Sequence, residues 1–231
     1  LSFYCVVGGW TIMYLYLTIT GKLSGLTPEG YAQMFTAASG DMLLSGVFFL
    51  LFGVLTILVV CKGISQGIEK VCSVLMPALF VIMVILAVIG SLQPGGWEGV
   101  KWYLTPDFSK VNGGTVVNAV GQVFFTMSLG MGIMVTYASY LKKDEDMPKA
   151  ATVTIIFDTL VSILAGFAIF PAVFAFGLAP SSGPGLVFIT LPNVFAQLPF
   201  GKVVAVGFYL LLLFAALPSA ISLLEVPVSY A

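Results

Sequence analysis

The chain has 231 residues, of which 59% are hydrophobic and 8% are charged, and its mean hydropathy is +1.09. Soluble domains carry roughly 25% charged residues, so this composition is that of an integral membrane protein. A net charge of -1 argues against a nucleic-acid partner. Histidine is absent, and the three cysteines have neither disulfide nor metal-site spacing. With no paired acidic motif either, we do not expect an enzyme.

Runs of about 20 apolar residues, the length that crosses a bilayer, recur along the chain. The chain starts without methionine inside one such run and stops just after another, which predicts an interior part of a longer protein. Six spans are expected to form one transmembrane domain over residues 1–231, at about 1–19, 42–61, 71–91, 115–141, 150–176 and 203–225.

The connections between these spans differ in length and polarity. Residues 20–41 predict a polar loop. Residues 177–200 predict an extracellular loop with a re-entrant element, because Pro192 interrupts an apolar segment that is too short to span. The links at 62–70 and 142–149 contain five of the nine lysines and are placed in the cytoplasm.

The fourth expected span is interrupted at its centre by Ser128, Gly130 and Gly132. Glycine costs a helix about 1 kcal/mol relative to alanine, and backbone groups freed in hydrocarbon need partners inside the protein. Transporters place discontinuous helices of this kind around substrate and ion sites at the bilayer midplane. A close helix crossing lined by glycine is the alternative, and this stretch alone favours both equally.

The fifth expected span contains Asp158, and an aspartate near a bilayer centre costs about 2.5 to 3.5 kcal/mol. Its side chain should therefore face protein or water. Ser162 lies one turn further along the same helix face, and Thr159 adds a hydroxyl nearby. Such an all-oxygen set suits a hard cation, and sodium fits better than a transition metal. A protonated Asp158 bonded to another helix is the alternative.

The third expected span contains Pro77 in its first turns. Proline lacks the amide hydrogen that a helix needs, so the start of this span is expected to unwind. An ordinary proline in the first turns of a regular helix is the alternative.

Several consecutive motifs resemble the bacterial branch of the neurotransmitter:sodium symporters. They are Lys62-Gly-Ile-Ser-Gln-Gly-Ile-Glu-Lys70, Met76-Pro-Ala-Leu-Phe80, Gly121-Gln-Val-Phe-Phe-Thr-Met-Ser-Leu-Gly-Met-Gly132 and Thr136-Tyr-Ala-Ser-Tyr140. The resemblance covers essentially the whole chain and matches the family's third to eighth transmembrane helices. It implies an all-α, polytopic, inverted-repeat sodium symporter fold with a discontinuous helix at 115–141.

The resemblance also implies a function, which is sodium-coupled symport of a neutral amino acid across the bacterial plasma membrane by alternating access. The expected partners are that amino acid and the lipid bilayer, and a homodimer is left open. A non-transporting amino-acid sensor on the same fold is the alternative function.

The family's substrate-binding residues carry over to Tyr4, Phe125, Ser128, Gly130, Met131, Ser219 and Leu223. The resemblance makes Tyr4 the partner of the substrate carboxylate and Phe125 the lid over the substrate. Met131, a flexible side chain, and Leu223 indicate a pocket for a large apolar or aromatic side chain.

Sodium ions are the implied cofactors. The resemblance assigns Thr126 and Asp158 to a first sodium site, and Ala215 and Ser219 to a second. Pro218 stands where the family usually offers a side-chain oxygen, which weakens the second site.

Ser162 matches the chloride-site position, and the negative charge of nearby Asp158 would repel chloride, so chloride is not expected to be required. The family also uses a spacing like that of Gly67 and Pro77 to unwind the third expected span and release sodium to the cytoplasm.

Overall fold

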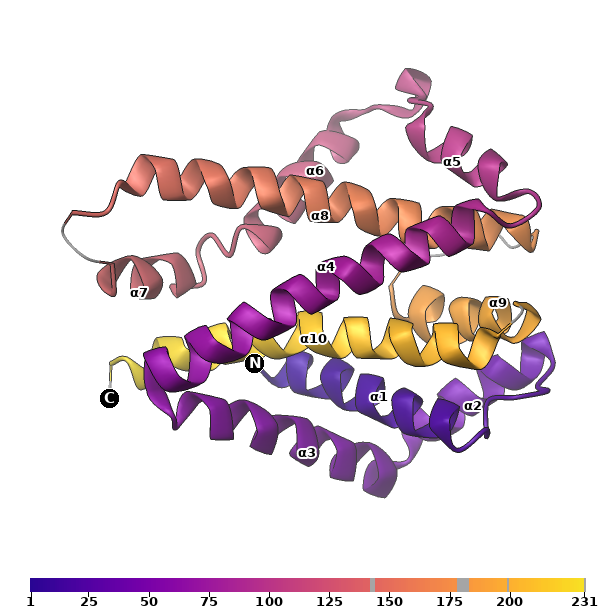
Figure 1. Ribbon diagram of the computed structural model, residues 1–231, viewed down its shortest axis with the longest axis horizontal. Coiled ribbons are helices and arrows are strands. Elements are labelled where there is room, and N and C mark those ends of the chain that lie inside the picture. The colour runs from indigo at the N-terminus through magenta and orange to yellow at the C-terminus, as the bar shows by residue number, and fades with distance from the viewer. Residues whose placement is uncertain (142–143, 178–182, 199, 231) are drawn as a thin grey trace.

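The computed structural model describes residues 1–141, 144–177, 183–198 and 200–230, so the expected connections at 142–149 and 177–200 lie partly outside the described residues. The described part is built of helices (Figure 1). In chain order they are α1 (Ser2–Ile19), α2 (Pro28–Gly40), α3 (Met42–Val60), the π-helix η1 (Ile64–Glu69), α4 (Lys70–Ser91), α5 (Gly96–Leu104), the 3-10 helix η2 (Phe108–Lys110), α6 (Gly113–Thr126), α7 (Ile133–Ser139), α8 (Met147–Ala175), the π-helix η3 (Leu186–Thr190), α9 (Leu191–Gln197) and α10 (Gly201–Val228).

The expected all-α fold is confirmed, and five of the described helices are long and apolar enough to cross a membrane. These are α1, α3, α4 together with the end of η1, α8 and α10. Helix α10 lies at the centre of the bundle, where it packs against α1 and α3 on one side and α4 on the other (Figure 1). Helix α8 packs on α4 and α5, outside this central group.

The ends of several helices are fixed by polar residues beside the apolar runs. The Asp41 carboxylate accepts hydrogen bonds from the amides of Leu43 and Leu44 at 2.9 and 3.0 Å, which caps the start of α3. The Asp146 carboxylate accepts from the Lys149 amide at 3.1 Å and caps α8. Such caps satisfy amides that have no partner within the helix, so the chain can enter the apolar segment without exposed donors.

Two connections between the expected spans contain helices. Helix α2 occupies much of the expected loop at 20–41; the Thr27 side chain accepts from the Gly30 amide, and Pro28 follows as a first helical residue. Helix α5 lies in the connection after α4 and packs against α8. The loop prediction was wrong because it gave weight to polarity and passed over the Thr27-Pro28 start signal.

Two prolines do not break their helices as the sequence suggested. Helix α4 continues through Pro77, and the irregular backbone lies earlier, at Gly63 with φ 76° and in the π-helix η1. The expectation that the start of this span unwinds is therefore wrong for the conformation described. Pro192 stands in the first turn of α9, a position that proline tolerates, and the segment is helical from Leu186 to Gln197.

Helices α1 and α3 approach closely at two glycines of α1. A Cβ atom at Gly9 would lie 2.8 Å from the backbone nitrogen of Phe49, and one at Gly8 would lie 2.5 Å from the Phe52 ring. The Phe52 ring is fully buried there. Small residues allow helix backbones to approach in this way in membranes, where close packing contributes to association.

We expect Gly9→Ala to lower the thermal unfolding midpoint of the protein in detergent, because the added methyl meets backbone rather than a movable side chain. Gly46→Ala in α3 is the matched control, since a Cβ atom there would meet nothing within 4 Å. The control gains about 1 kcal/mol of helix propensity with no clash. Equal midpoints for the two variants would contradict the close crossing.

Candidate substrate and sodium site

The predicted discontinuous helix is present: α6 ends at Thr126 and α7 begins at Ile133. Ser128, Gly130 and Gly132 have φ angles of 55°, 79° and 78°, in the left-handed region. Glycine adopts this region without cost, whereas the serine is held there at a cost of about 1 to 2 kcal/mol. The break therefore presents main-chain groups that are not used by a regular helix.

Two predicted substrate-binding residues meet at the start of the break. The rings of Tyr4 in α1 and Phe125 in α6 are stacked, with centroids 6.4 Å apart and planes inclined by 8°. Tyr4 also packs against a small cluster formed by Cys5, Phe52 and Ala220. Because Ala220 follows Ser219 in α10, the structure brings Tyr4 close to the part of α10 that was predicted to bind substrate.

The two residues predicted for the second sodium site, Ala215 and Ser219, lie one helical turn apart on α10. The Ser219 hydroxyl donates to the Ala215 carbonyl at 3.2 Å, so these two oxygens lie together. Pro218 lies inside the helix and has no amide hydrogen, which leaves the carbonyl of Phe214 without its usual helical donor. The Phe214 carbonyl oxygen is thus free to bind a cation. It lies one turn before Pro218, the position at which the family usually has a side-chain oxygen.

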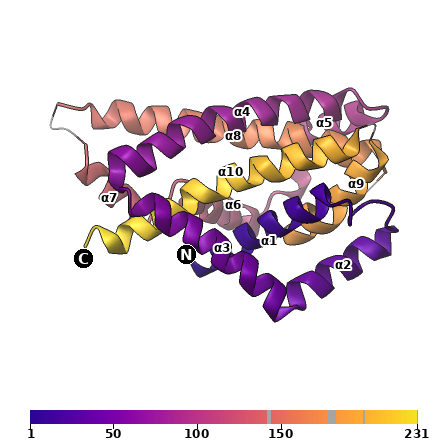
Figure 2. The same ribbon diagram turned by 60° about the horizontal axis from the view of Figure 1, so that its bottom comes forward.

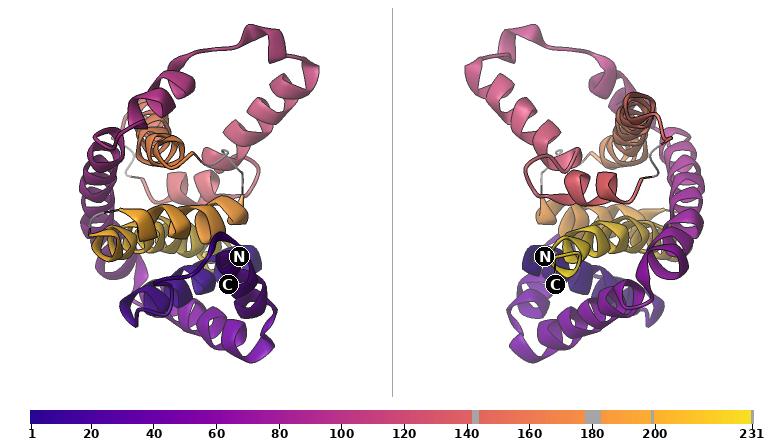
Figure 3. Two further views of the ribbon diagram at one scale, coloured as in Figure 1. Left: turned by 90° about the vertical axis from the view of Figure 1, so that its right-hand side faces the viewer. Right: turned by 90° about the vertical axis from the view of Figure 1, so that its left-hand side faces the viewer.

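The predicted first sodium site is not assembled in this structure. Asp158 lies near the middle of α8, half-buried, and no described residue forms a hydrogen bond with its carboxylate. Ser162 is exposed, while the Thr126 hydroxyl donates to the Val123 carbonyl of its own helix at 3.4 Å. Helix α8 packs on α4 and α5, and α6 stands apart from that layer (Figure 3).

The expected pocket around the break is also open. Phe125 is 48% exposed, and no residue of α6 is buried by the described part of the chain. A cavity of about 140 Å³ lies elsewhere, against the beginning of α10, and none of the predicted site residues lines it. Among the described helices, α1 contacts the break through Tyr4 and α10 packs against α7.

Sequence reasoning missed a second contact region beyond the break, where α7 packs beside the C-terminal end of α10 (Figure 2). The Tyr140 hydroxyl donates to Glu225 Oε1 at 2.6 Å, and the Tyr137 and Ser222 hydroxyl oxygens are 2.7 Å apart. Glu225 is 6% exposed. The cost of a carboxylate in an apolar span, which singled out Asp158, would have singled out Glu225 as well.

Gly132 explains how closely α7 can approach α10. Its φ of 78° disfavours other residues, and a Cβ atom there would lie 3.1 Å from Cγ1 of Val226. Glycine at this position therefore allows the left-handed backbone at the end of the break and also the close contact between α7 and α10.

Comparison with known proteins gives the family. Residues 39–230 match the family model described as the Sodium:neurotransmitter symporter family. This chain belongs to that family. The resemblance found in its motifs is confirmed, and together with the membrane-length helices it identifies a multi-pass membrane protein.

Named relatives agree with this membership. The chain is 44% identical over 229 residues to the sodium-dependent transporter YhdH of Bacillus subtilis, covering 99% of this chain and 51% of the relative. It is 27% identical over 267 residues to the sodium-dependent serotonin transporter of Drosophila melanogaster, covering 96% and 43%. The chain thus spans about half the length of these relatives.

A solved structure of the family has the same fold. The crystal structure of MhsT in complex with L-phenylalanine superposes with a TM-score of 0.89 and is 44% identical in sequence. The match covers 99% of this chain and 52% of MhsT. The expected symporter fold is therefore confirmed for this part of the protein.

We expect Tyr140 and Glu225 to be energetically coupled, because the Tyr140 hydroxyl is the described donor to a buried carboxylate. A double-mutant cycle with Tyr140→Phe and Glu225→Leu, followed by thermal unfolding in detergent, should give a coupling of about 0.5 to 1.5 kcal/mol, the net contribution of a typical intramolecular hydrogen bond. Tyr16→Phe, the loss of an exposed hydroxyl in α1, is the control. A coupling near zero would show that the bond contributes nothing to stability.

Proposed function

We propose that the intact transporter couples the entry of sodium to the uptake of a neutral amino acid by alternating access across the bacterial plasma membrane. The observation that carries the proposal is the break between α6 and α7, with Tyr4 and Phe125 stacked at one end and α10 packed at the other. Family membership and the sodium-dependent transporters among the relatives support it.

In this mechanism, substrate binds at the break and needs no covalent chemistry. The Tyr4 hydroxyl would donate to the substrate carboxylate, and main-chain groups around Ser128 and Gly130 would contact the rest of the amino acid. Phe125 lies at the end of α6, is exposed and contacts the ring of Tyr4. A small movement of this side chain would place its ring over a substrate that is bound to Tyr4. Closure of this kind removes the substrate from water before release on the other side.

Sodium would supply the driving force. Thr126 and Asp158 would hold the first ion once α6 and α8 are brought together, and the Ala215 and Ser219 oxygens would contribute to the second site. Carboxylate, hydroxyl and carbonyl oxygens are ligands for hard cations. Coupling arises only if sodium and substrate each bind the two conformations with different affinity.

The substrate is proposed to be a large apolar or aromatic amino acid. Met131 is half-buried beside the break and Leu223 is half-buried on α10, and both side chains are apolar. The L-phenylalanine present in the MhsT structure is consistent with this class. In binding competition, leucine and tryptophan should displace a bound label better than glycine and alanine.

Chloride is proposed not to be required. The Asp158 carboxylate lies one helical turn from Ser162, the position that matches the chloride site, so a fixed negative charge would repel the anion. Replacing chloride with gluconate should leave sodium-dependent uptake unchanged, and a severalfold fall in uptake would contradict the proposal.

The test of function uses the intact transporter in proteoliposomes with an inward sodium gradient and labelled neutral amino acids. Wild type should accumulate label with sodium and not with potassium, and Asp158→Ala should lose most of this uptake because it removes the charged ligand of the first site. Asp144→Ala, which removes an exposed carboxylate from the loop after α7, is the matched control and should retain uptake. Sodium-dependent binding without uptake of any label would point instead to a sensor.

A second prediction concerns the release of the inner sodium. We propose that the segment between Gly67 and Pro77 unwinds during transport, since η1 is already a π-helix and Pro77 leaves one carbonyl of α4 without a helical donor. Pro77→Ala restores the missing amide, so it should slow sodium release in stopped-flow measurements with a sodium-sensitive dye. An unchanged release rate would count against the unwinding.

A further inference from the structure

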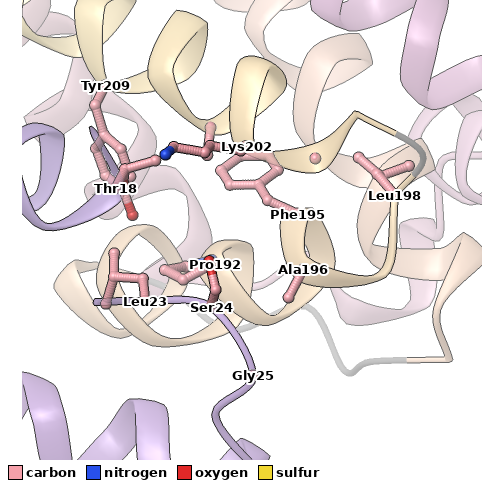
Figure 4. A pocket seen from close by; sticks show the side chains of 12 residues that line it. Thr18, Leu23, Ser24, Gly25, Pro192, Phe195, Ala196, Leu198, Lys202 and Tyr209 are labelled. Atoms are coloured by element: carbon pink, nitrogen blue, oxygen red, sulfur yellow. The ribbon is translucent and has the colours of Figure 1, made fainter. Parts of the chain in front are cut away.

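A cavity of about 140 Å³ lies between the end of α1, the following loop, α9 and the beginning of α10. Figure 4 shows Thr18, Ser24, Lys202 and Tyr209 among the side chains that line it. None of these residues belongs to the substrate or sodium sites described above. One buried water needs about 10 to 15 Å³ of such space, so the cavity is large enough for several waters or one small polar ligand.

The charge of the cavity wall is positive. Lys202 is the one lining residue with a permanent charge, and no carboxylate lines the cavity. The salt bridge found in the described part joins other residues, Lys110 and Asp107. Figure 4 shows the Lys202 ammonium reaching toward Thr18 and Tyr209, both of which are buried. The Ser24 hydroxyl, on the opposite wall, has no described hydrogen-bond partner and can donate to a ligand.

The electrostatics of α10 add to this positive wall. The first turn of α10 contains Lys202 and no acidic residue, and no side chain caps its amides. A helix of 28 residues has a partial positive charge at its N-terminus, and the lysine in that turn adds to the positive charge. The cavity thus has space and, from exposed residues at its edge, the Lys202 ammonium and the Ser24 hydroxyl, at a point where the helix N-terminus stabilises negative charge.

The loop that closes the cavity is held by the protein itself. The Tyr31 hydroxyl, from α2, donates to the Leu23 carbonyl at 2.9 Å, and both residues are buried. The position of the Ser24 wall therefore depends on contacts between α2 and the loop, so the cavity is formed before a ligand enters.

We propose that this cavity binds a phosphate group through the Lys202 ammonium and the Ser24 hydroxyl. Lysine binds phosphate as a point charge, and a hydroxyl donor adds a direct hydrogen bond. The group can come from free phosphate in the medium or from the headgroup of an anionic lipid, since both present the same oxygens. None of the lining residues was assigned to the substrate or sodium sites, so the proposal does not depend on the substrate or on sodium coupling.

The experiment measures the thermal unfolding midpoint of the intact transporter in phosphatidylcholine nanodiscs, at constant sodium and ionic strength, as inorganic phosphate replaces chloride. The midpoint should rise with phosphate, and Lys202→Gln should require at least about tenfold more phosphate for the same rise, as expected for the loss of a charged hydrogen bond. Lys22→Gln is the matched control, because it removes an exposed lysine near the end of α1 that does not line the cavity.

A second variant and a second lipid identify the mode of binding. Ala196→Phe keeps every charge but places a ring in the cavity wall, so it should also abolish the response to phosphate. Nanodiscs with phosphatidylglycerol that raise the midpoint of wild type but not of Lys202→Gln, and that remove the effect of added phosphate, would identify the lipid headgroup as the source.

The proposal is overturned if neither phosphate nor phosphatidylglycerol raises the wild-type midpoint, or if Lys202→Gln responds as wild type does. It is also overturned if Lys202→Gln lowers the midpoint equally with and without phosphate while the response remains, since Lys202 would then stabilise the protein without binding phosphate. Sodium-dependent binding of substrate by each variant verifies that it is folded, so a failure of this site is distinguishable from a failure of the transport function.

Discussion

The structure depends on one constraint, which is that backbone groups in hydrocarbon must find partners within the protein. The long helices satisfy this constraint by themselves, and the segment between Thr126 and Ile133 does not. Its left-handed residues interrupt the regular pattern in a span that is otherwise apolar. Such a break persists only if packing around it or bound ligands compensate for the lost hydrogen bonds. The contacts of α1 and α10 around this segment, and the proposed substrate and sodium, are those compensations.

The two halves of the broken span are attached differently. Helix α7 is joined to α10 by Tyr137, Tyr140 and the close approach at Gly132, whereas α6 meets the described bundle mainly where Phe125 stacks on Tyr4. A motion of α6 would therefore disturb few contacts, whereas a motion of α7 would disturb many. This asymmetry suits a site in which one half closes over a ligand while the other remains seated on the central helix.

The sequence predicted what hydropathy and chain chemistry determine locally. The positions of the membrane-length helices follow from runs of apolar residues, and the break follows from Ser128, Gly130 and Gly132, which favour turns over helix. Helix α2 was missed because the polar residues of 20–41 were interpreted as a loop, although Thr27 and Pro28 are typical of the start of a helix. Pro77 was misjudged for the described conformation, because the loss of one amide hydrogen bond does not by itself unwind a helix and α4 is regular from Lys70 to Ser91. Glu225 was missed although the reasoning applied to Asp158 covers it.

The candidate site shows where local reasoning ends. Tyr4 and Phe125 are far apart in sequence and meet in the structure, and the resemblance to a family, rather than composition, placed them in one site. Asp158 and Thr126 were assigned to one sodium site by the same resemblance, yet their helices do not pack together in this chain.

The difference has a physical cause: α1 and α10 contact each other directly, so residues on them are positioned by the described helices alone. Helix α6 is exposed, and its angle to α8 depends on whatever covers it, which in relatives twice as long includes sequence beyond the matched half. The first sodium site is therefore the part of the proposal that depends most on the intact protein, and the second, carried by a single helix, depends on it least.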